Sequence, residues 1–446
     1  MPNRLTALAL SLCLLVPIAA RAQRVAFTSE NEYPVGLAPR AVAVGDVDGD
    51  ELDDIAVANS DDDTVSVLVG TGSGEFIDTG ATYEVGLYPF AIVIVDVNGD
   101  GNGDIVTSDE NEDTVSVLVN DGFGSFSARA AFDTGSSPQG LVVRDFDGDG
   151  KRDLATANYV DETVTILKGS GTGNFTREQD DIPVGEGPVG LNSGDLDGDG
   201  KLDLVVTNTV GGLDSNGSLS LLKGNGNGTF VVQPEFVLPE ICGAIGCLPW
   251  AVEIEDFDGD SKADLVTTNQ DGDSVAIFRG NGDFSFQAPT VIEVSTTPAA
   301  SALADFDGDG KVDIVTIGSD DDLVTVLLGG GDGTFAEGID FDTGLTPMGI
   351  AVGHFNADSK PDMVIATQDD DAITVFLNVA TAAPCGGDCD GDQAVEMSEL
   401  VNMIDLALER SGAASCANGD TDSMGGITVE EIVGAVKNAA AGGCAQ

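Results

Sequence analysis

The sequence predicts an all-β fold, a seven-bladed β-propeller, with a small α-helical module after it. Three observations support this prediction. A carboxylate cluster recurs about every fifty residues, each period holds four apolar segments, and the array is incomplete at both of its ends. A fixed period of this length is typical of stacked or radially repeated units.

The recurring cluster reads Asp-x-Asp-Gly-Asp-x-x-x-Asp and begins at positions 46, 96, 145, 195, 256, 305 and, in a degenerate copy, 354. The intervals are 50, 49, 50, 61, 49 and 49 residues. Side-chain oxygens at alternate positions of a tight loop suit Ca²⁺, which takes about six to eight oxygen ligands. Asp-Gly runs also form turns without a metal, but a turn does not require four carboxylates to be held together against their repulsion. We therefore expect calcium in these loops.

The four apolar segments of each period are clearest in the second unit. Residues 91–95 lead into the acidic loop and residues 105–107 lead out of it. A polar turn precedes residues 114–119, and a glycine turn at 122–126 opens a fourth segment that ends near residue 135. Four strands rich in β-branched residues and joined by turns are typical of a propeller blade rather than a solenoid coil.

The ends of the array predict how the ring closes. The seventh unit stops after its third strand, residues 373–377, and residues 25–36 look like an orphan fourth strand. Pairing these two segments would complete a seventh blade and remove the open sheet edges that otherwise promote aggregation.

Acidic loop, apolar strand and Gly-x-Gly-x-Phe turn together resemble FG-GAP or VCBS repeats, the units of integrin α-subunit propellers. The resemblance covers roughly residues 24–380. It implies a structural calcium ion in the loop between the first two strands of each blade. By position, the implied ligands are Asp46, Asp48, Asp50 and Asp54; Asp96, Asn98, Asp100 and Asp104; Asp145, Asp147, Asp149 and Asp153; Asp195, Asp197, Asp199 and Asp203; Asp256, Asp258, Asp260 and Asp264; Asp305, Asp307, Asp309 and Asp313.

The seventh loop departs from this pattern. It offers His354, Asn356, Asp358 and Asp362. Because imidazole is a poor calcium ligand, we expect this site to be weak or empty. With the C-terminal loops included, we expect about six to eight calcium ions in the whole chain.

The composition excludes two classes of partner. The chain has 18 Lys and Arg against 77 Asp and Glu, a formal net charge of −59. So acidic a chain repels nucleic acid and anionic membrane surfaces. Bound cations, a halophilic habitat and acidic disorder would each explain the charge, but disorder conflicts with apolar runs such as residues 92–95.

We divide the chain into a signal peptide (1–22), the propeller (23–380) and a C-terminal module (381–446). The signal has a positive end, an apolar stretch and an A-x-A site that favours cleavage after Ala22. No later segment has the roughly 20 apolar residues of a membrane span. The expected location is therefore extracellular or on the cell surface. The six remaining cysteines favour disulfides, with Cys242–Cys247 closing a local loop and Cys385, Cys389, Cys416 and Cys444 pairing among themselves.

The C-terminal module carries EF-hand spacing twice. The candidate ligands are Asp388, Asp390, Asp392, Glu396 and Glu399 in the first copy and Asp420, Asp422 and Glu431 in the second, where Met424 occupies a ligand position. A loop followed by a helix, repeated, resembles a dockerin and would imply a cohesin-like partner. Glu399 and Glu431 stand where dockerins favour Asp, and the four cysteines are atypical. A terminal module stabilised by calcium and disulfides is the alternative.

We expect a partner to bind at the positions of the repeat where the residue type differs from blade to blade. In each unit, the residue after the proline should begin the innermost strand. These residues should together surround the axial opening, and they include Arg40, Phe90 and Trp250. Aromatic residues and Arg dominate binding hot spots, so these three form a candidate ligand face, whereas plugging of the channel is the alternative. Acids in the turns on the same face are expected to form a solvated surface.

These features predict a secreted, calcium-binding adhesion module for an extracellular protein or glycan. The alternative is a component of a polysaccharide-degrading system, as a dockerin-type assembly or a propeller enzyme. One histidine, one tryptophan and four tyrosines leave little for acid–base catalysis or sugar stacking. No catalytic constellation is recognised, so we expect a binding protein rather than an enzyme.

Overall fold

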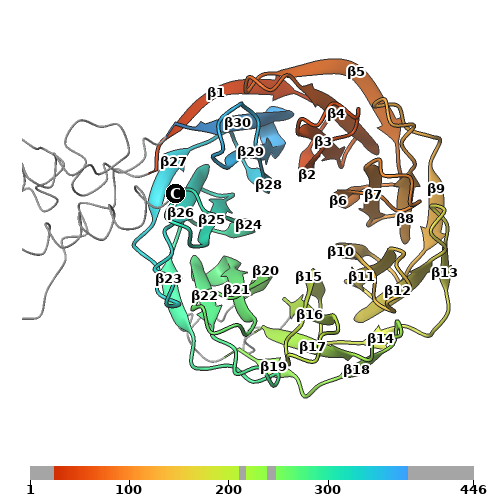
Figure 1. Cartoon of the computed structure of the whole chain (residues 1–446), viewed down its shortest axis with the longest axis vertical. Coiled ribbons are helices and arrows are strands. Elements are labelled where there is room, and N and C mark those ends of the chain that lie inside the picture. The colour runs from red at the N-terminus through yellow and green to blue at the C-terminus, as the bar shows by residue number, and fades with distance from the viewer. Residues whose placement is uncertain (1–24, 210–216, 239–247, 380–446) are drawn as a thin grey trace, which may run out of the picture. The chain divides into compact units, whose positions relative to one another are not determined.

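The computed structural model describes residues 25–209, 217–238 and 248–379. The expected signal peptide, the EF-hand and dockerin-like module and all seven cysteines lie outside these residues. Residues Phe27–Val379 form one compact unit of seven antiparallel sheets arranged around an axis (Figure 1). This is the expected all-β, seven-bladed propeller.

Each sheet is one blade, and we number the blades in the order of their acidic loops. Blade 1 comprises β2 (Pro39–Gly45), β3 (Asp54–Asn59), β4 (Thr64–Gly70) and β5 (Phe76–Glu84). Blade 2 comprises β6 (Pro89–Val95), β7 (Asp104–Asp109), β8 (Thr114–Leu118) and β9 (Ala130–Asp133). Blade 3 comprises β10 (Pro138–Arg144), β11 (Asp153–Asn158), β12 (Thr163–Gly169), β13 (Phe175–Arg177) and β14 (Ile182–Pro183). Blade 4 comprises β15 (Pro188–Gly194), β16 (Asp203–Asn208), β17 (Ser218–Gly224), β18 (Phe230–Val232) and β19 (Phe236–Val237).

The remaining blades follow the same order from the axis outwards. Blade 5 comprises β20 (Pro249–Glu255), β21 (Asp264–Asn269), β22 (Ser274–Phe278) and β23 (Thr290–Glu293), with the 3-10 turn η3 (Gln270–Gly272). Blade 6 comprises β24 (Pro298–Ala304), β25 (Asp313–Gly318), β26 (Leu323–Leu327) and β27 (Ile339–Asp342). Blade 7 comprises β28 (Pro347–Gly353), β29 (Asp362–Thr367), η4 (Gln368–Asp370), β30 (Ala372–Asn378) and β1 (Phe27–Pro34).

The ring closes as the sequence predicts. Strand β1 pairs antiparallel with β30, with Phe27 opposite Asn378 and Pro34 opposite Ala372. The first strand of the chain is thus the outermost strand of the last blade, and the two ends of the array lie side by side (Figure 1). Every blade has its edge strand, so no sheet is left with three strands.

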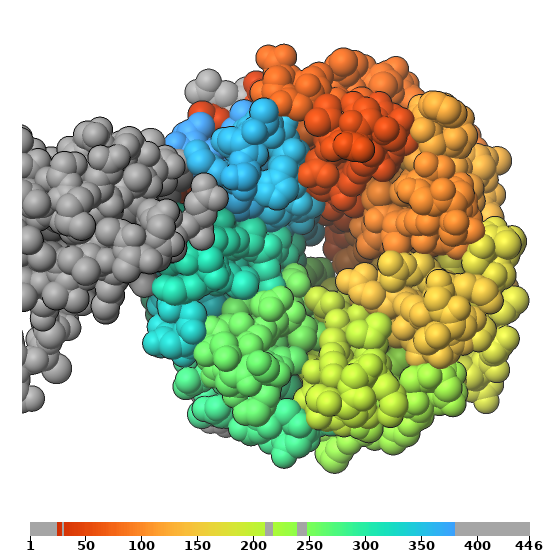
Figure 2. All heavy atoms as spheres, in the orientation of Figure 1, coloured from red at the N-terminus to blue at the C-terminus, as the bar shows by residue number. Residues whose placement is uncertain are grey.

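The hydrophobic core lies between neighbouring blades. Every second strand of a blade is buried at all of its residues, as in β3 and β29. One cluster joins Val42 and Ile55 of blade 1 to Val364 and Ile373 of blade 7. Blades pack against one another all round the ring and leave a hollow at its centre (Figure 2).

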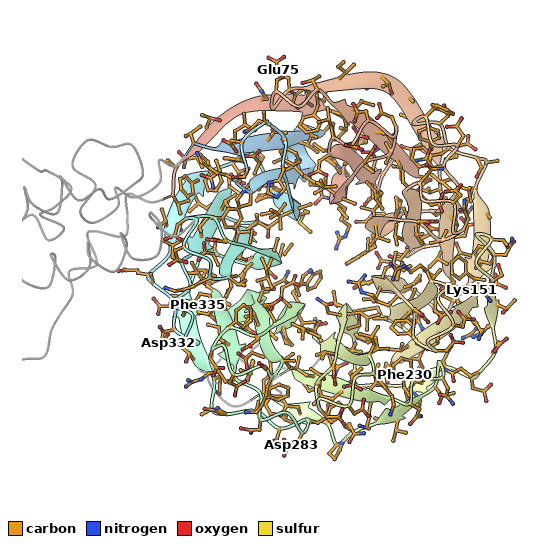
Figure 3. All side chains as sticks on the ribbon, in the orientation of Figure 1. Glu75, Lys151, Phe230, Asp283, Asp332 and Phe335 are labelled. Atoms are coloured by element: carbon orange, nitrogen blue, oxygen red, sulfur yellow. The ribbon has the colours of Figure 1, made fainter. Side chains whose placement is uncertain are left out.

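The innermost strands β2, β6, β10, β15, β20, β24 and β28 surround the axis (Figure 1). Their side chains project into the central space, whereas Glu75, Asp283 and Asp332, from turns between third and fourth strands, lie at the outer edge (Figure 3). Among the described residues, none forms a helix long and apolar enough to span a membrane.

Candidate functional site

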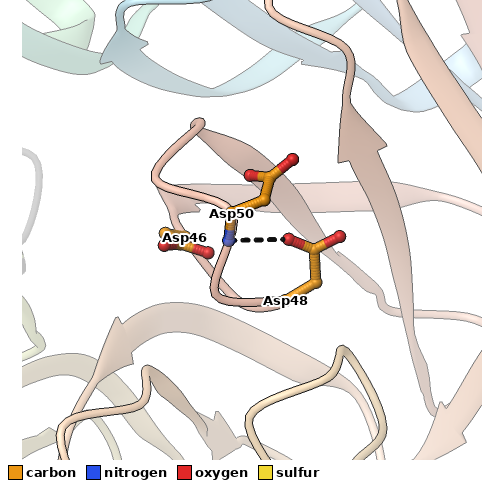
Figure 4. Close-up of side chains that lie close together, drawn as sticks. All are labelled: Asp46, Asp48 and Asp50. Atoms are coloured by element: carbon orange, nitrogen blue, oxygen red, sulfur yellow. Dashed lines mark hydrogen bonds between the residues drawn. The ribbon is translucent and has the colours of Figure 1, made fainter.

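The acidic loops connect the first and second strands of each blade and are curled by their own side chains. In blade 1, Asp46 Oδ1 accepts the N–H of Gly49 at 2.7 Å, and its Oδ2 accepts the N–H of Glu51 at 2.9 Å. Asp48 Oδ1 accepts the N–H of Asp50 at 3.3 Å (Figure 4). Gly49 has φ +82°, where a side chain would be strained. Backbone turn formation therefore gathers three carboxylates in one small loop.

Five loops bring three carboxylates together closely enough to share one cation. Their candidate ligand oxygens all lie within 4.8 Å of one another. Calcium–oxygen bonds of about 2.3 to 2.6 Å place two oxygens on opposite sides of one ion roughly 5 Å apart, so this spacing fits a single Ca²⁺. The clusters are Asp46, Asp48 and Asp50; Asp145, Asp147 and Asp153; Asp195, Asp197 and Asp199; Asp256, Asp258 and Asp260; and Asp305, Asp307 and Asp313.

The loops of blades 2 and 7 form no such cluster of three carboxylates within the described residues. In blade 2, the amide of Asn98 donates to Asp100 Oδ2 at 2.9 Å and takes the place of one acid. In blade 7, His354 Nδ1 lies 3.0 Å from the carbonyl oxygen of Lys360 instead of accepting loop N–H groups as an aspartate does. A weak or empty site in blade 7 stays a prediction.

The ninth residue of every loop has a structural role that sequence reasoning missed. Asp54 is fully buried, its Oδ2 accepts the N–H of Val47 and its Oδ1 accepts the N–H of Gly70, both at 2.8 Å. The carboxylate thus fastens the loop to the end of the third strand of its own blade. The same two bonds recur in the other six blades, at Asp104, Asp153, Asp203, Asp264, Asp313 and Asp362.

Burial is the main influence on these ninth carboxylates. It raises the pKa of Asp54 to about 6 and the pKa of Asp313 to about 7, against the opposing effect of the two N–H bonds. Neighbouring loop carboxylates add to the rise. A carboxylate that already accepts two N–H groups keeps lone pairs for a cation, so the ninth residue can fasten the loop and also bind calcium.

Two loops hold a second lysine at their carboxylates, supplied by the third strand of the blade. Lys223, from β17, forms an ion pair with Asp197 and lies 2.9 Å from Asp199 Oδ2. Hydrogen bonds from Lys223 and from Lys201 lower the pKa of Asp199 to about 2. Lys168 of blade 3 pairs with Asp147 in the same way, whereas blades 1, 2 and 6 have Val69, Val119 and Leu328 at this position. These third-strand lysines add to the lysine at the seventh loop position, which pairs with the fifth-position aspartate in blades 3 to 7.

The acidic loops also lie at the joints between blades. Gly124, in the glycine turn of blade 2, donates its N–H to the carbonyl oxygen of Val47 in the loop of blade 1 at 3.0 Å. The phenylalanine after this turn packs on the loop's second residue where that residue is aromatic, as with Phe335 and Phe257, whose ring centroids are 5.5 Å apart. The Gly-x-Gly-x-Phe signature thus joins blades 1, 2, 3, 4 and 6 to the acidic loop before each of them.

Acids on the opposite face are largely exposed, as expected of a solvated surface, but they also accept hydrogen bonds from the backbone. We call them the rim carboxylates, and they lie in the turns between second and third strands. Asp62 accepts the N–H of Leu37 at 2.7 Å within blade 1, and Asp371 of blade 7 accepts the N–H of Ala38 at 2.9 Å. Ala38 has φ +51°, so these bonds hold a strained corner between two blades. The acceptors at four further joints are Glu112 and Asp63, Asp161 and Asp113, Asp321 and Asp273, and Asp370 and Asp322.

The residues that follow the prolines surround the axis, as expected. All seven line one axial cavity: Arg40, Phe90, Gln139, Val189, Trp250, Ala299 and Met348. The three candidate ligand-face residues lie next to one another, because the Arg40 guanidinium stacks 3.9 Å from the centroid of the Phe90 ring. The Phe90 and Trp250 rings lie 6.4 Å apart across the ring of blades, tilted by 35°. Gln139 is expected at the axis but not among the ligand-face candidates, and nothing in the sequence indicates Glu253, which also lines this cavity.

The comparisons with solved structures show the fold. The crystal structure of BBS1N in complex with ARL6DN superposes with a TM-score of 0.56 at 12% identity, over 80% of this chain and 98% of that one. The periplasmic gluconolactonase PpgL of Pseudomonas aeruginosa gives 0.53 at 13% identity, over 69% and 86%. A virginiamycin B lyase from Staphylococcus aureus gives 0.52 at 13% identity, over 79% and 99%. These neighbours include enzymes and a binding domain, so the fold leaves the activity open.

The sequence comparison identifies the repeat. No curated protein matches the chain. The model of the FG-GAP-like repeat matches residues 46–107, 96–156, 145–206, 256–316 and 305–365. Each match begins at the first aspartate of an acidic loop and ends in the second strand of the next blade. Because these matches span more than half of the chain, the protein belongs to the family of FG-GAP-like repeat proteins.

Proposed function

We propose that this protein is an exported, calcium-stabilised binding module that recognises an extracellular protein or glycan. The observation that carries the proposal is the division of the ring into two unlike faces. One face carries carboxylate clusters that repeat at the joints between blades. The start of the inner strands, on the other face, carries residues that differ from blade to blade.

Calcium would act structurally in this proposal. An ion bound at Asp46, Asp48 and Asp50 would fix the loop whose Val47 carbonyl accepts the N–H of Gly124 in the next blade. Extracellular modules bind calcium with dissociation constants of about 10⁻⁴ to 10⁻³ M. At about 10 mM calcium, each occupied site then adds about 1.4 to 2.7 kcal/mol to the free energy of unfolding.

The test is a calorimetric calcium titration of the mature protein, with metal content by elemental analysis and thermal melts with and without EDTA. We expect about six to eight ions for the chain with its C-terminal loops, and a melting temperature that falls sharply in EDTA. One or two ions, or a melt unchanged by EDTA, would refute the calcium part. The acidity would then indicate a saline habitat.

For binding at the face opposite the acidic loops, the support from known structures is a similarity of fold. BBS1N, which has a similar fold, was crystallised in complex with ARL6DN, so a propeller of this kind can carry a protein-binding site. The rim carboxylates are engaged in blade joints, which leaves the inner-strand residues as the stronger candidates for recognition. Alanine scanning of Arg40, Phe90 and Trp250 tests this: lost binding with unchanged melting supports recognition, and lower stability alone supports plugging.

One observation favours the alternative of a polysaccharide-degrading enzyme. Burial raises the pKa of Glu253, in the wall of the axial cavity, to about 7, and a carboxyl group with such a pKa suits general acid catalysis. Glycoside hydrolysis uses two carboxyl groups, and Glu253 is the only acid in the described lining of the cavity. Incubation with a glycan panel distinguishes the two: product release favours the enzyme, and binding without turnover favours the module.

A further inference from the structure

The axial cavity has the size of a site for a small molecule. It encloses about 250 Å³ and is lined by the first residues of all seven inner strands. Pockets for drug-sized ligands hold roughly 300 to 1,000 Å³, so this volume suits a compound the size of one sugar or one amino acid. The lining is mainly apolar, with Val189, Ala299 and Met348 opposite the two aromatic rings.

Two polar groups in this wall lack hydrogen-bond partners. Arg40 Nε and Gln139 Oε1 are both buried and unpaired, and the Gln139 side chain as a whole is only 5% exposed. The amide nitrogen of Gln139 donates to Glu110 Oε1 at 3.0 Å, which fixes the orientation of the amide and leaves its oxygen free. Leaving a buried polar group unpaired destabilises the folded state. The cavity therefore presents one donor and one acceptor that a ligand could pair.

The donor also carries a positive charge that makes no direct ion pair, although Glu110 lies near enough to act on it electrostatically. Within the described part of the chain, no carboxylate forms an ion pair with Arg40, although the protein has a net charge of −59. Its guanidinium is held by stacking on Phe90 at 3.9 Å and by Tyr88, whose ring centroid is 5.9 Å away. Guanidinium groups remain protonated near neutral pH and bind carboxylates through two parallel N–H bonds.

The other ionisable residue of the lining lies deeper. Glu253 is three residues beyond Trp250 in β20, which at about 3.3 Å per residue is roughly 10 Å further along the axis. Its oxygens accept bonds from the Asn192 amide at 3.1 Å and the Ser301 hydroxyl at 3.4 Å. Glu253 is thus engaged with the wall, whereas the guanidinium of Arg40 lies beside the Phe90 ring.

We propose that the axial cavity binds a small carboxylate that carries a hydroxyl or N–H donor next to its acid group. The carboxylate pairs with the guanidinium of Arg40, and the donor pairs with Gln139 Oε1. The apolar part of the ligand lies against Trp250 and Phe90. This inference deepens the proposed binding function, on which it rests. Two sources supply such a compound: an acidic sugar, or the end of a peptide with its carboxylate and amide N–H.

Trp250 gives a direct readout, because it is the single tryptophan of the chain and lies in the cavity wall. We would titrate calcium-saturated protein with D-glucuronate or N-acetyl-alanine and follow tryptophan emission. The neutral counterparts are D-glucose and N-acetyl-alaninamide. We expect a saturable change with one acid and none with its neutral counterpart, and the arm that responds identifies the source. Arg40→Met should weaken binding at least about tenfold, because a charge-assisted bond is lost.

The matched control is Arg177→Met, which removes an arginine from the outer strand β13 that pairs with Asp181. It should bind as the parent does. If Arg40→Met fails to fold, Gln139→Met removes the unpaired acceptor at similar volume and should weaken binding instead. Equal responses to acid and neutral compounds, no response in either arm, or binding unchanged in the cavity variants would overturn the inference. Because the melt and metal content are measured on the same samples, such a failure leaves the calcium proposal standing.

Discussion

The ninth carboxylate of the seventh loop separates loop fastening from calcium binding. Asp362 is fully buried, its Oδ2 accepts the N–H of Phe355 at 3.0 Å and its Oδ1 accepts the N–H of Asn378 at 2.7 Å. Its loop has His354 in the first position and no cluster of three carboxylates. Asp362→Ala therefore removes two buried hydrogen bonds and no well-formed cation site.

The expected loss follows from those two bonds. A hydrogen bond to a charged group contributes about 1.5 to 3 kcal/mol, so removing both costs about 3 to 6 kcal/mol. Burial raises the pKa of Asp362, and the relief of this desolvation offsets part of the loss. We expect Asp362→Ala to lower the free energy of unfolding by at least about 2 kcal/mol. Asp362→Asn, which keeps one acceptor oxygen, should lose roughly half as much.

Denaturant unfolding at high and at negligible calcium measures this loss. It should be equal in the two conditions for Asp362→Ala, whereas Asp54→Ala in blade 1 should lose more when calcium is present, because it also removes a candidate ligand. Asp358→Ala, at an exposed loop position, is the control. If Asp362→Ala unfolds within about 0.5 kcal/mol of the parent protein, or Asp358→Ala costs as much, the ninth carboxylate does not fasten the blade.

Three further predictions follow from the same contacts. Lys223→Met removes the third-strand cation of the fourth loop and leaves Lys201 in place. Calcium affinity there should rise at least about fivefold in calorimetry, while the metal-free protein melts earlier. Glu253→Gln should change stability least at about pH 3, where the acid is neutral in both the folded and the unfolded protein. It should stabilise the protein above pH 7 by at most about 3 kcal/mol, because the folded pKa lies near 7 against 4.5 unfolded. Equal melting shifts at both pH values would contradict this. Asp63→Ala frees the N–H of Tyr88 and should cost about 1 to 2 kcal/mol in denaturant unfolding, which Asp63→Asn largely restores; a neutral Asp63→Ala would refute the role of the rim carboxylates.

The sequence predicts the frame of this fold because the frame is periodic. The spacing of the acidic loops gives seven blades, and the missing fourth strand at residues 373–377 gives the pairing of β1 with β30. The position after each proline places Arg40, Phe90 and Trp250 around the axis. Each of these conclusions needs only the order of strands and the alternation of their side chains.

Several roles that could not be predicted depend on partners distant in the sequence. Asp371 accepts the N–H of Ala38, 333 residues away, and nothing local distinguishes it from a solvated acid. Lys223 reaches the loop carboxylate Asp197, 26 residues before it, because β17 ends beside that loop. The unpaired oxygen of Gln139 is defined only by the wall that surrounds it. The sequence shows that such residues are polar, but it does not show which groups they contact.

Repetition itself indicates where function should lie. A residue type required by every blade, such as the ninth aspartate, has to satisfy seven equivalent places and so serves the frame. The position after the proline meets no such requirement, and its seven residues range from alanine to tryptophan around one cavity. Seven similar apolar residues would be enough to pack the inner strands around the axis. The wall of the cavity nevertheless contains two unpaired polar atoms, Arg40 Nε and Gln139 Oε1. Burying these two atoms without partners destabilises the fold, and a ligand that pairs with them would explain why they are present. The axial cavity is therefore the first place to look for a ligand.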